Sequence, residues 1–143
     1  MLSNTCKYGI RALSYIAGRS DGKKIIGIKK ISEDLGLPTP FLAKILQQLV
    51  KNKILKSSKG PHGGFVFLKD PGNVSLFDVI LIIDGDAFFQ TCVIHNRSCE
   101  SEGKLCPVHN EFARIRDEIT ELFRNTSIND LAKNKSGAEN IIF

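Results

Sequence analysis

Apolar residues recur at helical spacing in the first part of the chain and predict two helices there. Residues 8–17 place their apolar side chains on one face, and Gly18 follows as a natural end. After a short strand at 25–28, residues 29–35 predict a second helix, with Gly36 where a left-handed cap belongs.

A third helix follows with a sharper signal. Thr39 suits the N-cap and Pro40 the first helical position, where its missing N–H would have no partner anyway. The apolar positions that follow form one buried stripe: Leu42, Ile45, Leu46 and Leu49. Two short helices joined by a tight Gly-Leu-Pro turn predict a helix-turn-helix.

The residues after this pair of helices predict a β-hairpin. Residues 54–57 and 65–68 are β-type runs, and residues 58–64 between them hold three glycines and a proline. A hairpin directly after a helix-turn-helix is a winged helix, whose wing would bring Lys59 and His62 beside a duplex backbone. An ordinary hairpin, with glycines that serve only its turn, is the alternative.

The middle of the chain predicts one more short helix and a long loop. Ser75 and Asp78 resemble a capping box for a helix that runs to Ile83. Residues 86–106 show no sustained period and contain most of the cysteines, which favours a functional loop.

The last part predicts a long helix that Pro107 can begin. Its apolar positions follow a strict a/d pattern: Val108, Phe112, Ile115, Ile119 and Leu122. So narrow a stripe favours a seam between two chains over packing within one chain. Ser127 and Asp130 predict a cap for a final short helix, and the tail is expected to fray.

Together these patterns predict a mainly α fold with a small β-wing. A winged-helix domain is expected at 1–85, a cysteine-containing loop at 86–106, a dimerisation helix with a short final helix at 107–133, and a frayed tail at 134–143.

Composition adds a charge asymmetry. The 143 residues are 42% hydrophobic and 24% charged, as in soluble domains, and no membrane span or secretion signal is visible, so we expect a cytoplasmic protein. Residues 1–70 hold thirteen Lys and Arg against four Asp and Glu, whereas residues 71–143 hold seven against eleven. A basic first half suggests a polyanionic partner. We find no nucleotide-binding or catalytic motif in the sequence, so we do not expect an enzyme.

Three of the four cysteines stand close together in the sequence. Cys92, Cys99 and Cys106 are separated by six residues each, and His109 follows three residues later. Thiolates and an imidazole suit zinc or an iron–sulfur cluster. The long gaps favour the cluster, while zinc and metal-free redox-active thiols stay open as alternatives. Cys6 lies in an apolar helical context and is expected to pack in the core.

These features together resemble a known family. The opening YGIRALSYIA, the helix-turn-helix ISEDLGLPTPFLAKILQQLVKNKIL, the wing SSKGPHGGFVF, VSLFDVILIIDG, the three cysteines and SINDLA are similar to Rrf-type winged-helix transcription regulators. The cysteine pattern is nearest to the IscR-like iron–sulfur members. The resemblance covers residues 1–133 and implies a homodimer that binds palindromic promoter DNA.

The resemblance also implies ligands and DNA contacts. Cys92, Cys99 and Cys106 would hold a [2Fe–2S] or, in some members, a [4Fe–4S] cluster, with His109 as fourth ligand. Other members use an acidic residue as a cluster ligand at the position where this chain has Lys7. That ligand is absent here, so His109 is the better choice. Family position and helical facing suggest base contacts from the third helix, and the wing would add DNA contacts of its own. The candidates on the helix are Thr39, Pro40, Ala43, Lys44 and Gln47, and those on the wing are Lys59 and His62. A non-transcriptional iron–sulfur protein is the competing function, and the basic first half argues against it.

Overall fold

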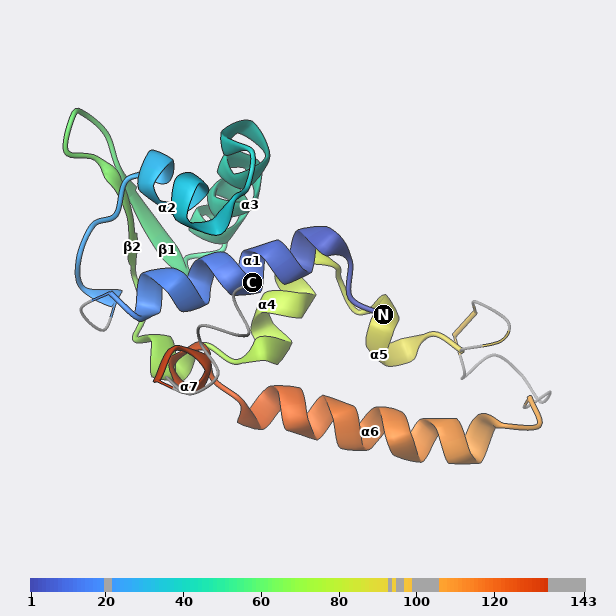
Figure 1. Cartoon of the computed structure of the whole chain (residues 1–143). Coiled ribbons are helices and arrows are strands. Elements are labelled where there is room, and N and C mark those ends of the chain that lie inside the picture. The colour runs from blue at the N-terminus through green and yellow to red at the C-terminus, as the bar shows by residue number, and fades with distance from the viewer. Residues whose placement is uncertain (20–21, 93, 95–96, 99–105, 134–143) are drawn as a thin grey trace.

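Helices from both halves of the chain pack around one apolar core (Figure 1). The computed structural model describes residues 1–19, 22–92, 94, 97–98 and 106–133. Its elements are α1 (Asn4–Ala17), α2 (Ile28–Leu35), α3 (Thr39–Lys51), β1 (Leu55–Ser58), β2 (Gly64–Phe67), η2 (Pro71–Asn73), α4 (Leu76–Ile83), α5 (Ala87–Gln90), α6 (His109–Asn125) and α7 (Ile128–Lys133). The expected fold class, mainly helical with a small antiparallel hairpin, is confirmed.

The helix-turn-helix is built as expected, with one difference at its turn. Gly36 takes the left-handed conformation at φ 63°, as an αL cap requires. Thr39 is not the N-cap of α3, because Pro38 holds that position and Thr39 is already helical. The Thr39 hydroxyl lies 2.8 Å from Oγ of Ser32 instead, and thereby joins the two helices.

The wing also pairs with the segment before α2, which the sequence pattern does not reveal. Strands β1 and β2 pair antiparallel, with Leu55 opposite Phe67. Of the strand expected at 25–28, Ile26 alone forms a bridge, and its backbone exchanges hydrogen bonds of 3.0 and 2.9 Å with Phe65. This bridge fixes the wing against the segment that precedes α2.

The segment predicted as a loop at 86–106 contains a short helix. Residues Ala87–Gln90 form α5, because two phenylalanines there have aromatic partners on α4 and α6. The Phe89 ring lies 4.6 Å from that of Phe77, and the Phe88 ring lies 6.0 Å from that of Phe123. Tertiary contacts of this kind leave no periodic trace in four residues.

Helix α6 begins at His109, two residues after Pro107, and its apolar stripe divides in two. Phe112 and Ile119 are half-buried against the chain. Val108, Ile115 and Leu122, seven residues apart, are exposed by 42, 45 and 60%. None of the residues of α6, all of them described, is fully buried.

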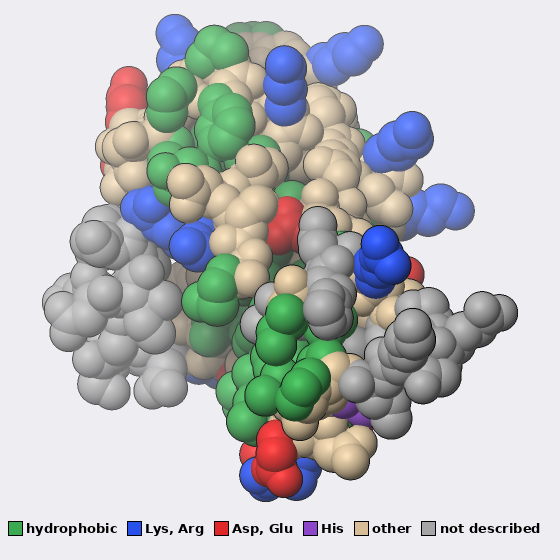
Figure 2. Space-filling model, turned by 90° about the vertical axis from the view of Figure 1, so that its right-hand side faces the viewer, with side chains coloured by type: hydrophobic (Ala, Val, Ile, Leu, Met, Phe, Trp, Pro, Cys, Tyr) green, Lys and Arg blue, Asp and Glu red, His purple; other side chains and the backbone are tan. Residues whose placement is uncertain are grey.

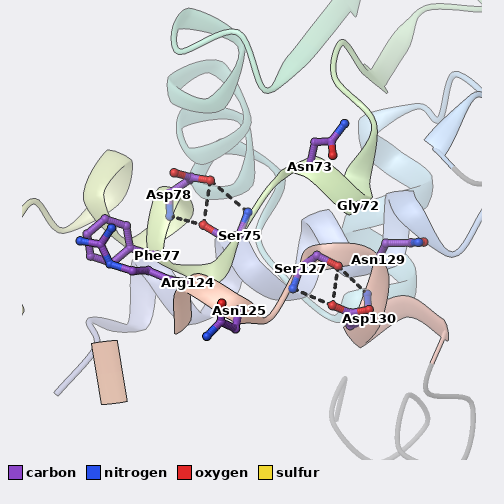
Figure 3. Close-up of a pocket in the computed structure, with 10 residues that line it drawn as sticks. All are labelled: Gly72, Asn73, Ser75, Phe77, Asp78, Arg124, Asn125, Ser127, Asn129 and Asp130. Carbon is purple, nitrogen blue, oxygen red and sulfur yellow. Dashed lines mark hydrogen bonds between the residues drawn. The ribbon is translucent and has the colours of Figure 1, made fainter. Parts of the chain in front are cut away.

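The C-terminal end of α6 is tied to the winged-helix core. The Leu76 backbone N–H donates to Thr126 O at 2.9 Å, and that of Ile128 donates to Val74 O at 2.8 Å. The predicted capping boxes at α4 and α7 are both present and line one polar crevice of about 620 Å³ (Figure 3). The two Ser and two Asp side chains in its lining thus already cap helices.

An ion-pair cluster joins α1 to α2 and gives a pH-dependent contribution to stability. The Tyr15 hydroxyl donates to the Asp34 carboxylate, and Lys30 pairs with it at 3.0 Å. These contacts, that of Tyr15 foremost, lower the pKa of Asp34 below its usual value. A carboxyl group with a lowered folded-state pKa stabilises the fold above its unfolded pKa of about 4, and this contribution disappears as the pH falls through the folded pKa.

Asp34→Asn should therefore reduce the free energy of unfolding more at pH 7 than at pH 3. Urea denaturation of both proteins at the two pH values measures this difference. Equal losses at both pH values would show that the Asp34 charge contributes nothing.

Candidate DNA-binding surface and cysteine site

The outward face of α3 presents the predicted base-reading residues. Pro40, Lys44 and Gln47 are exposed and follow at spacings of four and three, so they share one face of the helix. Thr39 and Ala43 are half-buried at its edge. The opposite stripe, from Leu42 to Leu49, is almost fully buried. Burial of one face therefore leaves the other available to a ligand.

Contacts from α1 and α2 hold α3 in place. Ser32 Oγ donates to Leu37 O at 2.6 Å across the turn. An Arg11 guanidinium N–H donates to Leu35 O at 3.2 Å. The Tyr8 and Phe41 rings meet edge to face at 5.7 Å. Helix α3 is thus packed against α1 directly and linked to α2 through the turn.

The wing presents Lys59 and His62 to solvent, and its glycines are there for steric reasons. Both side chains are exposed. A Cβ on Gly64, which has φ 158°, would lie 2.2 Å from Ile26 O, and one on Gly63 would lie 2.2 Å from Ser58 O. Close backbone packing therefore requires glycine at both positions.

Positive charge gathers at the same end of the molecule. Figure 2 shows Lys and Arg side chains projecting from the upper part of the molecule, the level of α2, α3 and the wing in Figure 1. Hydrophobic side chains also appear in the upper part, and a further group of them lies lower down, at the level of α6. A basic surface of this kind attracts the phosphates of a duplex.

Two of the four predicted cluster ligands lie side by side. The sulfurs of Cys92 and Cys106 are 3.7 Å apart, with Cys92 8% exposed and Cys106 half-buried. Two thiolates at about 2.3 Å from one tetrahedral ion lie about 3.8 Å apart, so this pair fits a tetrahedral zinc or iron centre. Cys99 lies outside the described residues.

His109 stands in the first turn of α6, where its backbone N–H donates to Cys106 O at 2.9 Å. Within the described residues, no three His, Cys, Asp or Glu side chains come together as a metal-holding group. The described part of the structure thus brings together Cys92 and Cys106, and does not add His109 to them.

A hollow of about 670 Å³ adjoins Cys92. Phe88, Phe112 and Ile119 form apolar walls, and Ser3 and Asp84 lie on its polar side. Its residues come from the segment before α1, from residues 84–92 around α5, and from α6, so the surroundings of Cys92 depend on three separate parts of the chain.

Two hydrogen bonds connect α4 to other elements beside this site. Gln48 Nε2 on α3 donates to Ile82 O at 2.6 Å, and the Ser3 backbone N–H donates to Asp84 Oδ2 at 2.8 Å. The sequence pattern missed both, because a polar residue beside a buried stripe carries no sign of its distant partner. Helix α3 is therefore bonded to Ile82 in the last turn of α4, five residues before α5 begins.

A helix-turn-helix with one exposed polar face, followed by a basic hairpin, defines a winged-helix DNA-binding protein. The comparisons with known proteins agree. Residues 2–134 match the model of the Rrf2 family, described as iron-dependent transcriptional regulators, and the chain belongs to this family.

The similar proteins are transcriptional regulators. An HTH-type transcriptional regulator of Aquifex aeolicus is 32% identical over 133 residues, covering 92% of this chain and 90% of the relative. The regulator IscR of Citrobacter koseri is 25% identical over 134 residues, covering 94% and 80%. The relatives support a role in transcription regulation.

Two solved structures share the fold. CymR, the global cysteine regulator of B. subtilis, superposes with a TM-score of 0.75 at 22% identity, covering 92% of this chain and 95% of that one. IscR of T. potens gives a TM-score of 0.75 at 20% identity, with coverages of 97% and 90%.

In the described residues, no helix has the length and apolar character that a membrane crossing needs.

Proposed function

We propose that this protein is a cytoplasmic homodimeric repressor whose affinity for palindromic operator DNA depends on an iron–sulfur cluster. The observation that carries the cluster is the 3.7 Å separation of the Cys92 and Cys106 sulfurs, which suits two thiolates on one tetrahedral iron. Cys99 and His109 would complete the ligand set. We favour a [2Fe–2S] cluster, since one histidine beside three cysteines is compatible with such a centre.

The two cysteines would act by linking two segments of the chain. Thiolates from Cys92 and Cys106 would connect the end of α5 to the segment before α6, and a bound cluster would supply a redox-sensitive link between them. Loss of that link changes the surroundings of α5 and hence of α4, whose Ile82 carbonyl accepts the hydrogen bond from Gln48 of α3. This is an allosteric proposal, so the two forms must differ in their affinity for DNA.

The DNA contacts would follow from the exposed face. Thr39, Pro40, Ala43, Lys44 and Gln47 would enter a major groove, where lysine can bond to guanine and glutamine to adenine. Lys59 and His62 of the wing would lie along the phosphates. Two copies related by a twofold axis read two half-sites, which is why we expect a palindrome.

Selection from random duplex DNA tests the proposal. Protein purified without oxygen and cluster-free protein are each used to enrich bound sequences, and the affinities for the enriched site are compared. We expect an inverted repeat, an affinity difference of about 5- to 150-fold between the two forms, and lower transcription from a promoter that contains the site. Enrichment of no sequence, or equal affinities, would contradict the proposal.

Lys44 and Lys59 should contribute to DNA binding in different ways. Lys44→Ala should relax the preference at one base pair by about 1–3 kcal/mol, because a base-edge hydrogen bond is lost. Lys59→Ala should weaken all sequences about equally and flatten the salt dependence, because a phosphate contact is lost. Binding titrations on single-base variants at several salt concentrations measure both, and identical profiles would remove Lys44 from sequence reading.

A further inference from the structure

The pair of Cys92 and Cys106 has a second chemical possibility. Their sulfurs are 3.7 Å apart, although thirteen residues separate the two cysteines in the chain. A disulfide needs a sulfur separation of about 2.05 Å, so the two sulfurs must approach by less than about 2 Å. Rotations about the side-chain bonds can supply most of a movement of this size.

The backbone beside each cysteine is held by hydrogen bonds to nearby residues. The Cys92 backbone N–H donates to Arg97 O at 2.7 Å, and Thr91 forms an antiparallel bridge with Ser98. Cys106 O accepts from His109 N–H at 2.9 Å, which ties that residue to the start of α6. Each cysteine is therefore held by its own local hydrogen bonds, and the contact between the two is that of their sulfurs, 3.7 Å apart.

We infer that Cys92 and Cys106 form a reversible disulfide when the cluster-free protein meets a peroxide. The formation of this bond is independent of the proposed function, whereas its regulatory meaning rests on that function. A disulfide occupies both sulfurs, so the oxidised protein has to be reduced before it can take up a cluster. The same pair would thus respond to oxidation in two ways, by loss of the cluster and by formation of the disulfide.

Burial assigns the order of the steps. Cys106 is the more exposed of the two, and its sulfur attacks one oxygen of hydrogen peroxide, so that the O–O bond breaks. Cys106 becomes a sulfenic acid, and the departing hydroxide takes the thiol proton to form water. The Cys92 sulfur then attacks the Cys106 sulfur, the S–O bond breaks, and a second water leaves. Two thiols and one peroxide have become one disulfide and two waters.

Cys6 is excluded from this chemistry by its surroundings. It is fully buried, and burial, assisted by the charge of Asp84, raises the pKa of its thiol to about 12. The thiolate is the reactive form of cysteine, so Cys6 stays inert in the folded protein. It therefore serves as an internal control.

Peptide mapping tests the inference, because trypsin places each cysteine on its own peptide. Cleavage after Lys and Arg gives peptides 1–7, 70–97, 98–104 and 105–114, which contain Cys6, Cys92, Cys99 and Cys106 in that order. Cluster-free, full-length protein is treated with one equivalent of hydrogen peroxide, alkylated in acid and digested. We expect 70–97 linked to 105–114, and release of the two peptides by dithiothreitol.

Variants make the result specific. The linked pair should persist in Cys99→Ser and in Cys6→Ser and should be absent from Cys92→Ser, where dimedone should label the sulfenic acid of Cys106. A map dominated by links to 98–104, or loss of thiols without any link between 70–97 and 105–114, would overturn the inference.

Cluster uptake separates this inference from the proposed function. Iron and sulfide are supplied to the oxidised protein and to the same protein after reduction, and bound iron is measured. We expect uptake in the reduced sample alone. Equal uptake in both samples overturns the regulatory part of the inference. Linked peptides together with no uptake in the reduced sample overturn the proposed function and leave the disulfide standing.

Discussion

Replacing Cys92 or Cys106 with alanine is expected to remove the iron and acid-labile sulfide from protein purified without oxygen. The two sulfurs lie 3.7 Å apart and would each form a bond to the cluster, so neither can be lost without leaving an iron short of a ligand. Cys99→Ala should have the same effect. Wild-type protein should be coloured and contain iron and sulfide in near-equal amounts, which elemental analysis and visible absorption measure.

Two further variants serve as comparisons for the loss of iron and sulfide. Cys6→Ala should leave the colour unchanged, because Cys6 is fully buried in the core. His109→Ala should give a more labile cluster, since water can replace one ligand. Colourless wild-type protein with stoichiometric zinc would contradict the cluster and leave the winged helix unaffected.

Ile115→Glu is expected to convert the protein from dimer to monomer. Ile115 is 45% exposed in the single chain and lies in the centre of the exposed row Val108, Ile115 and Leu122. Burying a carboxylate in an apolar seam costs several kcal/mol, and the twofold axis doubles the insertion. A loss of about 4 kcal/mol raises the dimer dissociation constant roughly a thousandfold. Sedimentation across a concentration series measures this constant.

Asn110→Glu is the matched control for this prediction. It adds the same charge to an exposed position of α6, five residues from Ile115 and on the other side of the helix. Its dissociation constant should stay near the wild-type value, and circular dichroism should show that both variants are folded. An Ile115→Glu protein that is folded and still dimeric would mean that α6 does not form the interface.

Local rules predicted the elements of this protein well, because a few neighbouring residues decide them. The side chains of Ser75 and Asp78 cap α4, as those of Ser127 and Asp130 cap α7. Gly36 takes the left-handed conformation that ends α2. Each of these choices is made within about one helical turn, so it is visible in the sequence.

Local rules failed where a distant contact competes with a local one. Thr39 has the side chain of an N-cap, yet its hydroxyl joins Ser32 on the preceding helix. The helix α5 exists because Phe88 and Phe89 meet aromatic rings of α4 and α6. Neither partner can be identified before the helices are placed relative to one another.

The sequence by itself determined the winged helix, the basic first half and the set of residues that could bind a metal. Tertiary structure alone decided which of those residues meet: it brings Cys92 and Cys106 to 3.7 Å across thirteen intervening residues. It also divided the α6 stripe into a row that packs within the chain and a row that stays exposed. The physical reason is that residue type and spacing specify local hydrogen bonds and the period of burial, whereas the pairing of remote side chains depends on how whole helices pack.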